Sequence, residues 1–308
     1  MRKPKLPDYF STLNNGKTTL YIKKEVEDNL PEQDINKFFN LFKNSNEEKT
    51  VYYGRSICKS LLLSSFKNES LVIRDYWHGG LLGKVSRNLL WQRLRPLREL
   101  SICEAARKNG ILTTEIIAFV KNKVVGPIYK CKLVSKEITN AVDLMELLLH
   151  SNNNRLLSQK KQIISKVSKA IKDMHDAGIY HADLHLKNIL IQPTDKGLFS
   201  VYIIDLDKSK QYEVISLHRR MKNIMRLDRS LEKFRKNISG REGLHESYQF
   251  PITKTDKVRF LREYVKSSYK PDRYFSGGKK EFLKFCFKNY RTPHKLHRFW
   301  WLVTSPLK

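Results

Sequence analysis

The chain has 308 residues, of which 40% are hydrophobic, so it can bury a substantial core in one two-lobed unit or in two domains. Its 59 Lys and Arg against 31 Asp and Glu give a formal net charge of +28, which requires an anionic partner such as nucleic acid, anionic lipid or a phosphorylated substrate. It has no run of about 18 apolar residues and no apolar stretch after the basic N-terminus, so we expect it to be neither membrane-spanning nor secreted. The four scattered cysteines form no CxxC pair and indicate reduced cytosolic thiols rather than a zinc site.

The first 140 residues are predicted to be mainly β-structure with one helix. Strand-like runs lie at residues 17–30, 51–75, 111–120 and 129–138. Within the second run, two apolar segments flank the polar turn Lys67–Ser70, which predicts a β-hairpin. A helix is predicted over residues 96–108, because a proline occupies its first turn and Asn109–Gly110 follows as a stop signal.

Helical patterns dominate after residue 140. The expected elements are, in chain order, a helix at 144–149, a loop at 151–154, a helix at 161–176, a strand at 189–191, a turn at 193–197 and a strand at 199–204. This order predicts an α+β fold of the protein-kinase-like, two-lobed kind. We expect a β-rich N-lobe over residues 1–140 and a helical C-lobe over residues 141–308.

The most informative segment is His181-Ala-Asp-Leu-His-Leu-Lys-Asn188, which is followed by Asp205-Leu-Asp207 at the end of an apolar run. The spacing His-x-Asp-x-x-x-x-Asn is that of a loop that places a base beside an acceptor hydroxyl and an amide oxygen beside Mg²⁺. Asp183 is therefore the predicted catalytic base. Asn188 and Asp205 are the predicted ligands of Mg²⁺ on the phosphates of ATP.

Four neighbouring side chains have less specific readings. His181 is expected to brace the loop backbone rather than to react. Asp207 is either a second metal ligand or a helix cap. His185 stands where small-molecule kinases often carry histidine, and Lys187 is a candidate to approach the γ-phosphate. The alternative for Asp183 itself is a turn residue at the start of the next segment.

A phosphate-binding lobe needs a cation on its third strand and a carboxylate on the next helix. Arg74 follows Leu-Val-Ile where the usual pattern is Val-Ala-Ile-Lys, and Glu99 lies on the predicted helix that follows. Lys59 or Lys84 is the alternative cation. Residues 51–56 are a weak match to a glycine-rich loop that covers phosphates, because Gly54 is their single glycine.

Basic residues gather in two later segments. Residues 251–308 combine Lys and Arg with aromatic side chains, among them Phe299, Trp300 and Trp301, which suits a lipid–water interface or else a terminal helix with its aromatic residues in the core. The Arg-rich segment 219–229 suits the phosphates and carboxylates of an acceptor, or else forms an ordinary solvated helix.

The chain resembles the lipopolysaccharide kinases, and among them the 3-deoxy-D-manno-octulosonic acid (Kdo) kinases. The stretches that carry the likeness are Tyr53–Ser56, Ile73–Leu81 with the segment to Glu99, Tyr180–Leu190, Ile204–Lys208 and Lys222–Leu231. The resemblance implies a protein-kinase-like fold, ATP, Mg²⁺, and phosphorylation of a Kdo hydroxyl on a lipid A precursor by a peripheral enzyme at the cytoplasmic face of the bacterial inner membrane. It implies neither nucleic acid nor a protein partner, and it accommodates arginine at position 74.

Four features bear on the alternatives. Ala182 replaces the arginine with which protein kinases grip a phosphorylated loop, and no Ala-Pro-Glu follows Asp205, so a regulated protein kinase is disfavoured. Residues 75–78 lack a further arginine usual in the Kdo kinases, and residues 259–264 resemble the core heptose kinases. The remaining alternatives are a core heptose kinase and a catalytically inactive scaffold that binds an anionic surface or nucleic acid.

Overall fold

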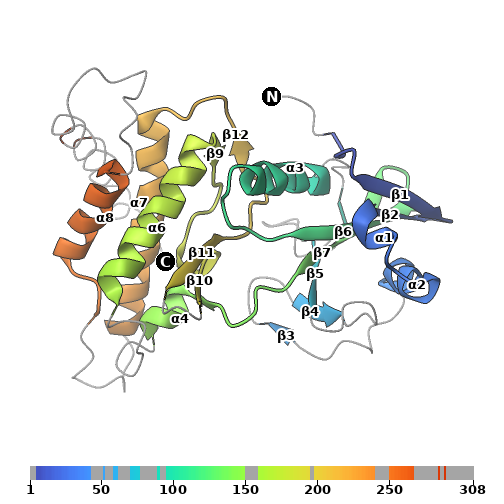
Figure 1. Cartoon of the computed structure of the whole chain (residues 1–308), viewed down its shortest axis with the longest axis horizontal. Coiled ribbons are helices and arrows are strands. Elements are labelled where there is room, and N and C mark those ends of the chain that lie inside the picture. Colours follow the sequence, from blue (N-terminus) through green and yellow to red (C-terminus); the bar gives the residue numbers. More distant parts are fainter. Residues whose placement is uncertain are drawn as a thin grey trace, which may run out of the picture. The chain divides into compact units, whose positions relative to one another are not determined.

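The computed structural model of the chain describes residues 5–42, 51–52, 58–61, 70–76, 89–90, 95–149, 159–194, 198–239, 250–266, 284 and 288 (Figure 1). The chain divides into two units, Met1–Glu104 with Thr114–Thr139, and Ala105–Thr113 with Asn140–Lys308. Residues 105–113, which the sequence placed in the N-lobe, thus group with the second unit, where the Leu112 carbonyl accepts a hydrogen bond from the Ile203 amide at 3.0 Å. Among the described residues, no helix is both long and apolar enough to cross a bilayer.

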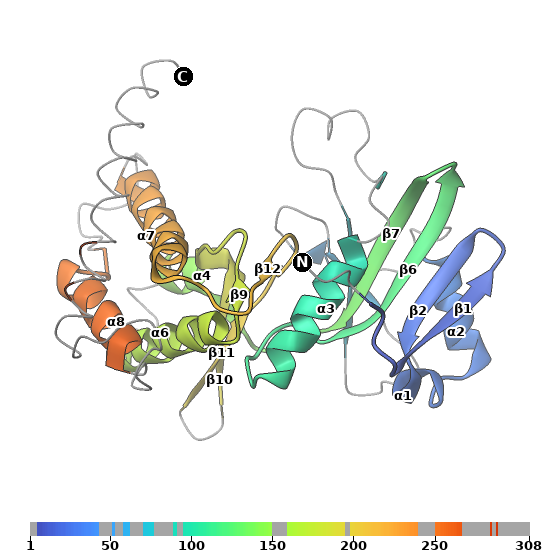
Figure 2. The same cartoon turned by 90° about the horizontal axis from the view of Figure 1, so that it is seen from above.

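The first unit contains a seven-stranded antiparallel sheet in the order β1-β2-β6-β7-β5-β4-β3. Figure 2 shows β7, β6, β2 and β1 of this sheet side by side. Its strands are β1 Phe10–Asn15, β2 Thr18–Lys23, β3 Val51–Tyr52, β4 Cys58–Leu61, β5 Leu71–Asp75, β6 Ile116–Val125 and β7 Ile128–Lys136. The helices of this part of the chain are α1 Lys24–Glu27, α2 Glu32–Asn40 and α3 Arg95–Lys108.

The two strands that flank the central β6–β7 pair show alternating buried and accessible residues. Leu20 and Ile22 of β2 are buried at every second position, as are Leu71 and Ile73 of β5, so each strand buries one face. Residues 116–120 of β6 are all buried, which means that both faces of this strand are covered.

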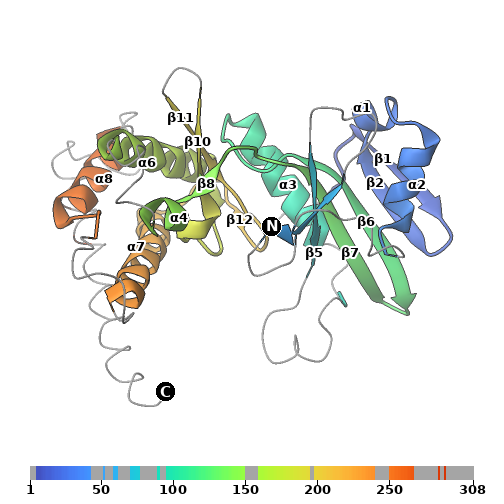
Figure 3. The same cartoon turned by 90° about the horizontal axis from the view of Figure 1, so that it is seen from below.

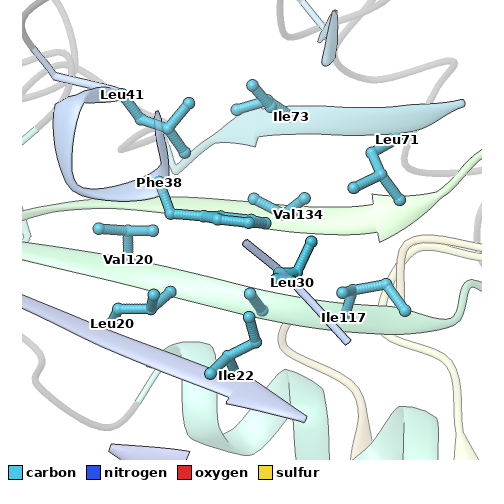
Figure 4. Packing of buried hydrophobic residues seen from close by; sticks show 11 residues of the cluster. Leu20, Ile22, Leu30, Phe38, Leu41, Leu71, Ile73, Ile117, Val120 and Val134 are labelled. Atoms are coloured by element: carbon cyan, nitrogen blue, oxygen red, sulfur yellow. The ribbon is translucent and has the colours of Figure 1, made fainter. Parts of the chain in front are cut away.

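The N-terminal segment is part of this core. Leu30, Phe38 and Leu41, from α2 and the turns beside it, pack with β2, β5, β6 and β7 in one apolar cluster (Figure 4). The sequence did not predict β1 or α2, and its strand run 17–30 is wrong beyond Lys23, because residues 24–27 turn into α1. Residues 10–41 thus complete the sheet rather than forming a separate extension.

The strand pairing of the predicted hairpin and the predicted helix are confirmed. β4 pairs with β5 in antiparallel register, and α3 spans residues 95–108. Residues 62–69, with most of the predicted turn, lie outside the described residues. The turn after α3 contains Gly110 at φ +72°, a left-handed conformation that glycine adopts at little cost. The strand predicted at 111–120 begins only at Ile116, because residues 111–115 form the connection from the helix.

The second unit consists of helices around two small sheets, one in the order β11-β10-β8 and one that pairs β12 with β9 (Figure 3). Its strands are β8 Val142–Asp143, β9 Ile179–Tyr180, β10 Ile189–Pro193, β11 Phe199–Ile203 and β12 Lys210–Gln211. Its helices are α4 Leu144–Leu149, α6 Lys160–Asp176, the 3-10 turn η2 Leu186–Asn188, α7 Leu217–Ser239 and α8 Lys254–Lys266.

Helix α6 is the centre of the helical layer. Its buried residues Ile163, Val167 and Ile171 recur at helical spacing, and Ser168 Oγ donates to the Phe260 carbonyl of α8 at 2.8 Å. The helix ends at Gly178, where φ is +77° and a Cβ atom would lie 2.0 Å from the Tyr212 carbonyl oxygen. Only glycine fits this turn, which leads directly into β9.

The predictions for α4, α6, β10 and β11 are confirmed to within a few residues. Helices α7 and α8 agree with the helical alternatives given for residues 219–229 and for the start of the segment 251–308. The predicted loop 151–154 and most of the turn 193–197 lie outside the described residues.

Candidate active site

The loop formed by residues 181–188 connects β9 to β10, includes η2 and carries Asp183 at its surface. The Asp183 side chain is 54% exposed, and its Oδ2 lies 3.7 Å from Nε2 of His185. The backbone of the same residue is fixed on both sides, because its amide donates to Nδ1 of His181 at 3.0 Å and its carbonyl accepts from Nδ2 of Asn188 at 2.9 Å. The structure therefore presents a carboxylate to solvent on a backbone that is held in place.

His181 is buried and links this loop to the strand that leads to Asp205. Its Nδ1 accepts from the Asp183 amide and its Nε2 lies 3.0 Å from the Ile204 carbonyl, so the ring proton must be on Nε2. Burial lowers the pKa of His181, which favours the neutral ring that these two hydrogen bonds require. The bracing role expected of His181 corresponds to these contacts.

Asn188 and Asp205 supply oxygen atoms at the end of this link. Asn188 is buried and uses its amide nitrogen to hold Asp183, so its amide oxygen is the atom suited to a metal. The Ile204 amide donates to the Asn188 carbonyl at 3.0 Å, which ties the two backbones together. Mg²⁺ is commonly held by one or two protein oxygens together with phosphate oxygens and water, so this donor set fits Mg²⁺.

Asp205 has an unusual backbone. Its side chain is exposed and its φ is +59°, in the left-handed region that aspartate enters more readily than most residues. A conformation of this kind costs about 1–3 kcal/mol and is often found at functional sites. Asp207 is half-buried, and its reading as a helix cap is wrong, because the next helix begins only at Leu217.

Asn223 of α7 holds the backbone of the loop at His181 with its side-chain amide. Its Oδ1 accepts from the His181 amide at 3.2 Å and its Nδ2 donates to the His181 carbonyl at 2.8 Å. The sequence did not predict Asn223 as a site residue. The available signal was a polar residue of low helix propensity on an apolar helix face, where a buried amide needs partners.

Three more side chains hold the backbone of the loop. Ser209 Oγ accepts from the Ala182 amide at 3.2 Å, and Ser230 Oγ accepts from the Leu186 amide at 3.3 Å. Arg226 donates to the Ala182 carbonyl and also lies over the Tyr180 ring, 5.6 Å from its centroid. With so many fixed backbone groups, the loop is preorganised rather than adaptable.

The predicted cation and carboxylate of the first unit also meet. Arg74 of β5 forms an ion pair with Glu99 of α3, and Tyr76 Oη donates to the second oxygen of Glu99 at 2.7 Å. Glu99 is buried, whereas the Arg74 side chain keeps 23% of its surface exposed. The pair can therefore hold a guanidinium in a fixed direction while leaving part of it accessible.

The remaining predicted residues are only partly described. Lys187 is exposed on η2. Gly54, Lys84 and the side chain of Lys59 lie outside the described residues, as does the aromatic tail around Phe299.

We expect buried His175, close to the loop, to make the stability of the protein depend on pH. The pKa of His175 is lowered to about 3, chiefly by burial and further by the charges of Arg220 and His181, while Asp176 acts in the opposite direction. The folded protein then binds fewer protons than the unfolded chain below pH 6.5, so stability is lost as pH falls through that value. At pH 5 this amounts to about 2 kcal/mol for His175.

Urea unfolding at pH 5 and pH 7 tests this prediction. His175→Gln should remove about 2 kcal/mol of the difference in unfolding free energy between the two pH values, because glutamine takes up no proton. His218→Gln, at an exposed position of α7, is the matched control and should keep the wild-type difference. An equal pH dependence in His175→Gln and wild type would contradict the assignment.

The chain is similar to proteins of one known family. Residues 48–264 match the model of the lipopolysaccharide kinase (Kdo/WaaP) family, a range that includes Arg74, Glu99, the 181–188 loop and Asp205. A 3-deoxy-D-manno-octulosonic acid kinase of Vibrio cholerae is 33% identical over 165 residues, which are 52% of this chain and 65% of the relative. One of Haemophilus influenzae is 27% identical over 185 residues, which are 58% of this chain and 73% of the relative.

The chain thus spans just under two thirds of the length of the Vibrio cholerae relative. A solved structure described as WaaP in complex with acyl carrier protein superposes with a TM-score of 0.51, covering 85% of this chain and 98% of that chain at 16% identity. At that identity the likeness shows a shared fold. The family match covers more than half of the residues, and the chain belongs to the lipopolysaccharide kinase (Kdo/WaaP) family.

Proposed function

We propose that the protein is an ATP- and Mg²⁺-dependent kinase with a two-lobed, protein-kinase-like architecture that phosphorylates a Kdo hydroxyl of a lipid A precursor. The observation that carries the proposal is the braced loop, which holds an exposed Asp183 next to Asn188 and the strand end at Asp205. Arg74, positioned by Glu99, would contact the ATP phosphates, with Lys187 and Gly54 as further phosphate contacts.

The chemistry assigned to each group is simple. The acceptor hydroxyl loses its proton to an Asp183 oxygen as its own oxygen forms a bond to the γ-phosphorus, and the bond to the ADP oxygen breaks. When bound, Mg²⁺ would neutralise phosphate charge, and Asn188 and Asp205 are the residues that would hold it. The protein's main contribution is positioning, which agrees with the many contacts to the loop backbone.

An anionic acceptor is supported by two arginines beside the loop. Arg226 and Arg229 lie one turn apart on α7, both half-buried and both close to Tyr180. Burial, followed by the charge of Arg226, lowers the pKa of Arg229. Neither arginine has a carboxylate partner among the residues that the structure describes. A carboxylate or phosphate on the acceptor would relieve this repulsion.

Arg229→Gln should therefore raise the KM for the acceptor by about tenfold or more and leave the KM for ATP within twofold, because a charge-assisted hydrogen bond is lost. Lys233→Gln, an exposed charge removal one turn further along α7, is the matched control. An acceptor whose Kdo carboxylate is reduced to an alcohol should abolish the difference between Arg229→Gln and wild type if the carboxylate is the bound group. A difference that persists would assign the arginines to a lipid phosphate, and an unchanged KM would remove them from the acceptor site.

The test of the proposed function uses γ-labelled ATP, Mg²⁺ and two acceptors, one with Kdo and one without. Labelling of the lipid only by wild-type protein and only in the presence of Kdo would support a Kdo kinase. ATP binding without transfer would direct the search to the heptose-bearing core, the alternative acceptor. Loss of ATP binding as well would favour the inactive scaffold.

We also propose that the enzyme acts at the anionic cytoplasmic face of the inner membrane, because a net charge of +28 favours binding to anionic lipids. Vesicles with and without anionic lipid would test this, and equal sedimentation with both would contradict it. A protein partner is also worth assaying, since the solved structure of shared fold is a complex with acyl carrier protein.

A further inference from the structure

A chain of hydrogen bonds between buried side chains runs from helix α8 to the 181–188 loop. Tyr264 Oη lies 2.8 Å from Nδ1 of His175 on α6, and Nε2 of that histidine lies 3.1 Å from Oδ1 of Asn223 on α7. Asn223 in turn holds the amide and carbonyl of His181. Tyr264, His175 and Asn223 are at most 1% exposed, so water does not compete for these hydrogen bonds.

The donors and acceptors of this chain can be assigned from one end. The His181 amide can only donate, so the group of Asn223 that faces it must be the oxygen. The same oxygen faces Nε2 of His175, which must therefore carry the ring proton. Nδ1 of His175 is then an acceptor, and Tyr264 must donate its hydroxyl proton to it.

The charge beside Tyr264 agrees with this assignment. Arg220, whose guanidinium pairs with Asp176, interacts electrostatically with Tyr264. A guanidinium only donates, so it does not compete for the Tyr264 proton. Tyr264 and His175 thus donate toward the Asn223 oxygen, and the His181 amide donates to the same oxygen from the loop.

We propose that Tyr264 is a positioning residue for the 181–188 loop and acts by fixing the tautomer of His175. This role goes beyond the proposed function, and its kinetic consequences rest on that function whereas its effect on the loop does not. Without the hydroxyl, Nδ1 of His175 would lose its donor, and only the Asn223 oxygen would still favour a proton on Nε2. In the other tautomer an Nε2 lone pair would face the Asn223 oxygen, and the amide of Asn223 would be pushed away from His181.

The experiment compares Tyr264→Phe with Ser168→Ala. Ser168 lies in the same α6–α8 interface, is fully buried and donates a hydrogen bond to the Phe260 carbonyl. It makes no hydrogen bond to the side chains of Tyr264, His175 or Asn223. Nitrogen NMR of His175 should show the Nε2–H tautomer in wild type and Ser168→Ala and a mixture in Tyr264→Phe. Hydrogen exchange of the His181 and Asp183 amides should become about tenfold faster in Tyr264→Phe alone.

Kinetics supply the second readout. The kcat of Tyr264→Phe should fall about tenfold with an unchanged KM for ATP, while Ser168→Ala keeps the wild-type kcat. In a His175→Gln background the further change Tyr264→Phe should have no effect on exchange, because a glutamine amide donates without tautomerism. Unchanged exchange and tautomer in Tyr264→Phe would overturn the proposal. Loop changes without any kinase activity in wild type would sustain it and count against the proposed function alone.

Discussion

Asp183→Asn should lower the rate of phosphoryl transfer by about 10²- to 10⁴-fold while leaving the fold and ATP binding nearly intact. Asparagine has the shape of aspartate but cannot accept the hydroxyl proton. The two hydrogen bonds that fix this residue use its backbone amide and carbonyl, so the substitution leaves them in place. The measurement is kcat with labelled ATP and acceptor, together with the nucleotide Kd and the melting temperature.

Asp173→Asn provides the matched control for this experiment. Asp173 is a partly exposed carboxylate of α6 that pairs only with Lys169 one turn earlier among the contacts described, and its replacement should leave kcat unchanged. If Asp183→Asn kept more than about a tenth of the wild-type kcat, Asp183 would not be the base. The loop would then serve to position groups supplied by another part of the chain.

Asp205→Asn should abolish the Mg²⁺-dependent part of nucleotide binding without loss of stability. The left-handed backbone at this position, with φ +59°, is one that asparagine also tolerates, so only the charge is lost. Asp205→Ala should lose the same binding and in addition unfold more easily by about 1 kcal/mol, because alanine is strained at positive φ. Nucleotide titrations with Mg²⁺ and with a chelator, together with urea unfolding, separate the two effects.

Asp207→Asn is the variant to compare with Asp205→Asn. Asp207 lies two residues further on and remains a candidate second ligand, so the extent of its effect reports how much of the metal site it forms. Mg²⁺-dependent binding that survives in Asp205→Asn but fails in Asp207→Asn would move the main ligand to position 207. Survival in both variants would place the metal elsewhere.

The parts of the site that local sequence determines were predictable. The spacing of Asp183 and Asn188, the histidine two residues before Asp183 and the carboxylate after an apolar strand are all contained in short segments of sequence. The sequence also suggested the pairing of Arg74 with Glu99, since a strand and the next helix are close along the chain. The ion pair between Arg74 and Glu99 can form once β5 and α3 have folded.

The parts that depend on packing between distant elements were not predictable. Asn223 and Tyr264 meet His175 only because α6, α7 and α8 fold together, and no local pattern assigns partners across 48 or 89 residues. The predicted strand run 17–30 was wrong beyond Lys23 for a local reason. Residues 24–27, Lys-Glu-Val-Glu, favour a helix by intrinsic propensity, yet the β-branched and aromatic residues just before them masked the boundary.

The contribution of residues 10–41 to the sheet has a practical consequence for protein production. A truncated chain that starts at residue 48, where the family match begins, would retain all the proposed catalytic groups. It would nevertheless leave β6 as an open edge and uncover the apolar side chains of Ile117 and Val120 that now face the N-terminal segment. Such a protein should accumulate in inclusion bodies, so the limit of recognisable homology is not the limit of the folding unit.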